Sequence, residues 1–65
     1  MNVAAIQQWI DNLPVGTLFE TNEIKVGLAP TDFGKKFKEA VFNGTFKNVD
    51  FVRVKSNNHH EYKRV

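Results

Sequence analysis

The sequence predicts an α+β domain with three helices, a short strand after the first helix and a C-terminal β-hairpin. Apolar residues recur at three- and four-residue spacing within residues 3–13 and again within 33–41, as on the buried face of a helix. Residues 49–65 are rich in valine and aromatic residues and contain an Asn pair at which an extended chain can reverse. A chain of 65 residues suits one domain, which we expect to span residues 1–65.

The composition is that of a globular protein with a small core. Hydrophobic residues make up 42% of the chain and include six Phe. Cysteine is absent, so neither a disulfide nor a thiolate metal site supports the fold. No apolar run approaches the ~20 residues that a bilayer span needs, and the N-terminus lacks the pattern of a secretory signal. We therefore expect a cytoplasmic protein with no membrane partner.

The first helix and the first strand follow from caps and breakers. Asn2 can cap a helix, and Pro14 stops it because the residue before a proline disfavours helical angles. Residues 16–20 are rich in strand formers after a glycine, which predicts a turn and a brief strand. The apolar stripe of this helix comprises Val3, Ile6, Ile10 and Leu13.

A second, short helix is predicted over Glu23–Val26, capped by Thr21 or Asn22. Gly27 permits a left-handed exit, and Thr31 can then cap the third helix, Thr31–Asn43. Two helices joined by a short turn that contains glycine form the helix-turn-helix pattern.

The third helix is amphipathic. Its buried face comprises Phe33, Phe37, Ala40 and Val41. The opposite side carries Lys35, Lys38 and Glu39, with Lys36 at its edge. Phe42 also points away from the buried stripe, which is unusual for a large apolar side chain. The hairpin could cover it, or the helix could end before it; otherwise it is a candidate anchor for a protein interface.

The C-terminal segment predicts two strands, Phe51–Lys55 and His59–Arg64, joined by residues 56–58. We expect Val52 and Val54 to face inward. Val49 and Phe51 have the opposite parity, so a bulge or a late strand start is expected.

Basic residues are concentrated in the second half of the chain. Residues 31–65 carry eight Lys/Arg against four Asp/Glu, whereas residues 1–30 carry one against three. A basic helix followed by a basic hairpin favours contact with the phosphates of double-stranded DNA. The outer helix face has no Arg and few Asn or Gln, so side chains that read bases are scarce.

Three blocks of residues, 13–19, 33–37 and 58–65, resemble those of very small winged helix-turn-helix proteins from phages and Gram-positive bacteria, many of unknown function. The resemblance implies a DNA-binding regulator in a bacterial cell, with the third helix in the major groove and the hairpin wing on the backbone. It implies groove or phosphate contacts from Lys35, Lys36 and Lys38, and wing contacts from Arg53, Lys55 and Lys63.

Four further residues are candidate DNA contacts with a structural alternative. Thr31 could bind a phosphate at the helix N-terminus or act as a simple cap. Asn57 and Asn58 could contact the minor groove or only form the turn. His59, near the wing tip, could make a contact with phosphate that responds to pH.

The alternative function is a protein-interaction module that binds a host or phage protein through Phe42. Acidic residues scattered among the basic ones dilute the positive field and favour this alternative: Asp32, Glu39, Asp50 and Glu61. For DNA binding, useful specificity would need a homodimer or a partner protein.

The sequence contains no arrangement typical of an enzyme. It lacks a nucleophile beside a base, a phosphate-binding glycine loop and paired carboxylates, so we expect no catalysis, cofactor or small-molecule substrate. His59 and His60 are adjacent on a strand and should point to opposite faces, so we expect no metal site there.

Overall fold

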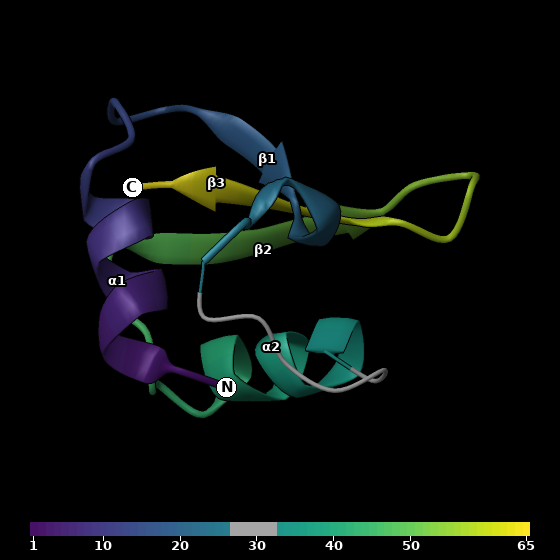
Figure 1. Cartoon of the computed structure of the whole chain (residues 1–65). Helices are drawn as coiled ribbons and strands as arrows, with labels where there is room; N and C mark the ends of the chain where they lie inside the picture. The colour runs from purple at the N-terminus through teal and green to yellow at the C-terminus, as the bar shows by residue number, and fades with distance from the viewer. Residues whose placement is uncertain (27–32) are drawn as a thin grey trace.

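The computed structural model describes residues 1–26 and 33–65 of the chain. Within them it contains two α-helices, α1 (Val3–Asp11) and α2 (Phe33–Phe42), and a single 3₁₀ turn, η1 (Thr21–Glu23). The strands β1 (Leu18–Glu20), β2 (Val49–Val54) and β3 (His60–Arg64) form one antiparallel sheet in the order β1-β3-β2 (Figure 1).

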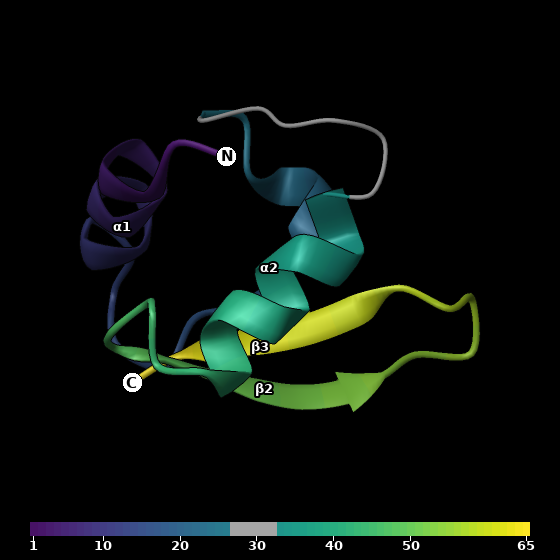
Figure 2. The ribbon, with the colours of Figure 1, turned by 90° about the horizontal axis from the view of Figure 1, so that it is seen from below.

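The two helices pack on the same face of this sheet. Trp9 of α1 meets Phe19 of β1 edge to face, with ring centroids 5.1 Å apart. Phe37 of α2 meets Tyr62 of β3 in the same way at 4.9 Å. Phe19 and Tyr62 are directly paired across the two strands, so their side chains share a face. Figure 2 shows α2 crossing β2 and β3 on that side.

Helix α1 forms as predicted. The side chain of Asn2 accepts a hydrogen bond from the backbone N–H of Ala5 at 3.1 Å, which satisfies one of the unpaired donors of the first turn. Ile6 and Ile10 are fully buried, one turn apart. The helix ends at Asp11, before Pro14.

The prediction of three helices in a winged helix-turn-helix arrangement is wrong, because Glu23–Val26 is not an α-helix. Glu20 caps the turn instead of Thr21 or Asn22, in a reciprocal pair with Glu23. Ile24 is then extended, and its side chain is buried in the core. A four-residue helix forms too few hydrogen bonds to offset the free-energy cost of nucleation, whereas burial of the Ile24 side chain stabilises the extended conformation. The α+β class itself agrees with the structure.

The predicted turn at Gly27 and the cap at Thr31 lie outside the described residues. In the described part, the third predicted helix corresponds to α2, with Phe37 and Ala40 buried as expected. No helix among the described residues is long and apolar enough to cross a bilayer.

The hairpin contains the predicted bulge. Phe51 pairs with Tyr62 and Arg53 pairs with Glu61, so Val52 is the extra residue between them. Because of the extra residue, Phe51 and Val54 lie on the same face of the sheet although they are three residues apart. Val54 pairs with His60. Val52 and Val54 are both exposed, so the expectation that they are buried against the core is wrong.

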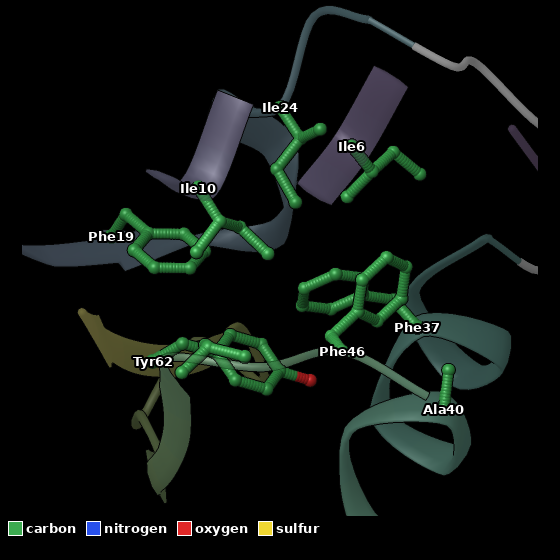
Figure 3. Packing of buried hydrophobic residues seen from close by; sticks show 9 residues of the cluster. Ile6, Ile10, Phe19, Ile24, Phe37, Ala40, Phe46 and Tyr62 are labelled. Carbon is green, nitrogen blue, oxygen red and sulfur yellow. The ribbon is translucent and has the colours of Figure 1, made fainter. Parts of the chain in front are cut away.

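The core lies between the sheet and the helices (Figure 3). Tyr62 is fully buried and forms its centre, with Phe46 from the segment between α2 and β2 closing one side against Phe37. The whole buried cluster comprises Ile6, Ile10, Phe19, Ile24, Phe37, Ala40, Phe46, Val49 and Tyr62.

The hydroxyl of Tyr62 is buried, and so is that of Thr21 near it. Neither makes a hydrogen bond of good geometry with the described residues. Burial raises the pKa of the Tyr62 phenol from 10.0 to about 12, and the Thr21 hydroxyl partly opposes this shift. The neutral phenol is therefore the form that the folded state prefers.

We expect the tyrosine absorbance of the folded protein to titrate with a midpoint near 12 rather than 10, because ionisation is disfavoured in the core. Tyr62 is the single tyrosine, so phenolate absorbance reports it alone. Its contribution to stability should be complete below pH 10 and lost as pH rises toward 12.

Tyr62→Phe is the matched control. It should fold, lose the absorbance change and have a free energy of unfolding within about 1 kcal/mol of the wild type, because the hydroxyl it removes has no good partner. A midpoint near the ordinary tyrosine value in a protein that is still folded would contradict this account.

Candidate interaction surfaces

Arg53 and Lys63, predicted to share one surface with the lysines of α2, lie on the other face of the sheet. Tyr62 points toward the helices, so its neighbours Glu61 and Lys63 point to the open face of the sheet. Arg53 pairs with Glu61 and shares that face. The lysines of α2 belong to the helical layer on the other side (Figures 1 and 2). Arg53 and Lys63 are therefore separated from the α2 lysines by the sheet, whereas Lys35 lines a depression together with Glu20 and His59.

Two cations of the hairpin, Arg53 and Lys55, are paired with carboxylates. Lys55 Nζ lies 2.6 Å from Glu20 and 3.9 Å from Glu61, and Arg53 Nε lies 3.0 Å from Glu61. His59 Nδ1 lies 2.7 Å from the other oxygen of Glu20. The charges of Lys55 and Arg53 offset those of Glu20 and Glu61.

The pKa directions agree with this pairing. The hydrogen bond from Lys55, followed by that with His59, lowers the pKa of the Glu20 carboxyl. The same bond to Glu20 raises the pKa of the Lys55 ammonium. Lys55 is therefore held by Glu20. Lys63 is exposed on the open face of the sheet, across from Asp50.

The asparagines of the hairpin tip stabilise the turn. Asn57 Oδ1 accepts a hydrogen bond from the N–H of His59 at 3.0 Å. Asn58 has a φ of 66°, in the left-handed region, and its N–H donates to the Lys55 carbonyl at 2.9 Å. Both have the structural role given as the alternative to minor-groove contact.

The two histidines have different partners but line the same depression, so the expectation that they point to opposite faces is wrong. His59 is bonded to Glu20, whereas the ring of His60 lies edge to face with Phe51 at 6.1 Å. Residues 1–26 and 33–65 contain no group of three side chains suited to hold a metal. A depression beside these residues is lined by η1, the start of α2 and the hairpin, including Phe33, Lys35 and His60.

Phe42, the last residue of α2, is 65% exposed, although it is a large aromatic residue. Its ring lies 5.5 Å from that of Phe51 on β2. Lys38, one turn earlier, places its Nζ 5.9 Å from the Phe42 ring and 5.0 Å from the Phe51 ring. We call Lys38, Phe42 and Phe51 the Phe42 patch.

The rest of α2 extends this patch. Lys35 and Lys36 are exposed, whereas Lys38 is half-buried because it lies along the two rings. A shallow depression beside Phe42 is lined by Lys35, Lys38, Glu39, Phe42 and Asn43. Thr31 lies outside the described residues.

The sequence did not reveal that Glu20 and Glu61 neutralise the hairpin. Strand alternation could have shown that Glu61 and Arg53 lie on the face opposite to Tyr62, where they can meet. Glu20 could not have been found in this way. It meets Lys55 across 35 residues, and the contact requires the register of β1 on β3.

We expect Glu20→Gln to destabilise the protein at neutral pH and to have little effect in acid. The carboxylate contributes stability above its unfolded pKa of 4.5, and this stability is lost as pH falls through the lower pKa of the folded state. Urea unfolding of both proteins over a pH series measures the difference.

Glu39→Gln, on α2 away from this cluster, is the matched control and should not change the pH profile. A difference between wild type and Glu20→Gln that is the same at every pH would show that the carboxylate charge is not what stabilises the hairpin.

Comparison of the chain with protein-family models, with curated proteins and with solved structures gives no match. The resemblance to small phage and Gram-positive proteins therefore rests on the short blocks of sequence alone. The interpretation of function depends on the surfaces described above.

Proposed function

We propose that this protein is an interaction module that binds another protein through the Phe42 patch. The 65% exposure of Phe42 carries the proposal. Phe37 of the same helix is in the buried cluster and Phe33 packs against it, so α2 is attached to the core without Phe42. Phe42 is not part of the buried cluster, and its contact with Phe51 leaves most of its side chain exposed.

The patch has the composition of an interface anchor. A Phe side chain that loses most of its remaining exposed surface contributes about 1–2 kcal/mol to association. Aromatic residues are common among those that dominate binding energy. Lys38 adds a cation at the margin of the rings, which favours a partner with an acidic group nearby.

The patch is also held in position before binding. The Phe51 ring is fixed by contact with Tyr62, with centroids 5.5 Å apart, and Phe42 lies against Phe51. Lys38 contacts both rings of the patch. Side chains already ordered in the unbound protein lose little conformational entropy on binding.

The charge arrangement favours this proposal over DNA binding. Arg53 and Lys55 are engaged with Glu61 and Glu20, and Arg53 lies on the face of the sheet away from α2. A duplex would need these cations and the helix lysines on one surface.

We expect Phe42→Ser to abolish capture of a protein partner from a nuclease-treated lysate of the source organism. The variant removes the anchor, and its free energy of unfolding should stay within about 0.5 kcal/mol of the wild type because the side chain is exposed. Affinity capture followed by mass spectrometry, with urea unfolding in parallel, measures both effects.

Val15→Ser is the matched control, since Val15 is 75% exposed in the turn before β1. It should leave capture unchanged. If Phe42→Ser retains the same partners, or if Val15→Ser loses them equally, the patch is not the binding surface.

The exposed lysines of α2 favour a second candidate function, contact with nucleic-acid phosphates. Lys35 and Lys36 are exposed on α2, and Glu39 is the single carboxylate of that helix. Such contacts would set affinity but would carry no sequence information.

For this second candidate we expect Lys35→Ala to lower the salt dependence of duplex binding and Arg53→Ala to leave it unchanged. A lost phosphate contact reduces the slope of log affinity against log salt by about 0.9. Arg53 lies on the opposite face and is paired with Glu61. Fluorescence anisotropy at several salt concentrations measures the slope, and failure to bind any duplex at low salt eliminates this candidate.

A further inference from the structure

The sheet has one long outer strand whose other edge is next to the Phe42 patch. β3 is central, and β1 has three residues whereas β2 has six. No strand of the described residues pairs with the second edge of β2. Figure 2 shows β2 at the margin of the molecule with α2 crossing beside it. An outer strand of this length is a template for pairing with another chain.

The backbone groups that face outward can be identified from the hairpin bonds. The Lys55 N–H donates to His59, and the Val65 N–H donates to Asn48, so the backbones of Asn48 and Lys55 face β3. Because backbone direction alternates along an antiparallel strand, Val49 and Phe51 present their N–H and C=O to the outside. Beyond the bulge at Val52, Val54 does the same.

The outward-facing backbone lies beside the side chains of the patch. Phe51 contributes its ring to the Phe42 patch and its N–H and C=O to the unpaired edge. A strand added there would have Phe51 directly opposite, Phe42 and Lys38 on its helix side, and the exposed Val54 further along. Alternate side chains of the strand would therefore meet two aromatic rings and a cation.

We propose that the partner binds as an extended segment that adds to β2 and places apolar and carboxylate side chains against the Phe42 patch. The proposal rests on the proposed function and specifies its geometry and its ligand. Backbone pairing supplies a sequence-independent part of the affinity, and pockets for alternate side chains supply the selectivity. Lys35 and Lys38 outnumber Glu39 on this side of α2, which selects an acidic segment.

A second copy of the chain is a poorer occupant. Antiparallel pairing of two β2 strands about Phe51 would bring the two Lys38 ammonium groups to the same place, and like charges repel. It would also set Val49 opposite Arg53, whose side chain lies on the other face because of the bulge. The charge and the register both favour a different chain.

The probe is a synthetic nine-residue peptide with glutamate and phenylalanine alternating on one face and threonine on the other. Two-dimensional amide spectra of the labelled protein detect even weak binding, at ~1 mM. We expect shifts and slower amide exchange at Val49, Phe51 and Val54, and about tenfold weaker binding when lysine replaces glutamate.

Backbone pairing is tested by N-methylation of the peptide. Methyl groups on one alternate set of amides should eliminate binding, and methyl groups on the other set should not, because only one edge of the peptide faces β2. If both sets, or neither, affect the affinity, strand addition is wrong.

Val54→Pro tests the same contact from the protein side. Proline removes the outward N–H of Val54 and is tolerated at a sheet edge, whereas Val54→Ala keeps the N–H. We expect about fivefold weaker peptide binding for Val54→Pro than for Val54→Ala. Equal affinities would overturn the proposal, as would the absence of any shift with the acidic peptide. Shifts confined to Phe42 and Lys38 would overturn strand addition and leave the patch as a protein-binding surface.

Discussion

The ring of Tyr62 joins the elements of this small protein. It is fully buried on the central strand and contacts Phe19 of β1 at 5.7 Å, Phe37 of α2 at 4.9 Å and Phe51 of β2 at 5.5 Å. All three strands and α2 therefore meet at one side chain. In a chain of 65 residues no second core can replace these contacts, so the orientation of Tyr62 constrains the rest of the molecule.

That orientation also decides where the charges lie. Because successive strand residues alternate, an inward Tyr62 places Glu61 and Lys63 on the open face of the sheet. Glu61 then meets Arg53, and the hairpin brings Lys55 to Glu20. Arg53 and Lys55 become part of a network of ion pairs with Glu20 and Glu61, and the α2 lysines remain in the helical layer. Packing of the core thus separates two groups of charge that are close in sequence.

Local patterns in the sequence predicted most elements but not how they combine. The Asn2 cap, the stripe of Ile6 and Ile10 and the parity conflict around Phe51 are all signals within a few residues, and each was confirmed. The second helix failed because Ile24 is drawn into the core, which a local pattern does not report. The exposure of Phe42 followed from helical spacing, but its contact with Phe51 and Lys38 depends on how α2 crosses the sheet.

The bulge at Val52 makes β2 a better partner for a different chain than for a second copy of the protein. Edge strands commonly avoid self-association through bulges and charges, and β1 achieves the same by being short. The bulge disturbs symmetric pairing of β2 with itself, yet a different chain can still pair with Val49, with Phe51 and, beyond the bulge, with Val54. So short a ladder gives little affinity on its own. Side chains must supply the remainder, and Phe42 and Lys38 stand at the position where the backbone is unpaired. Backbone and side chains at this edge therefore favour an acidic, apolar partner over a second copy of the protein.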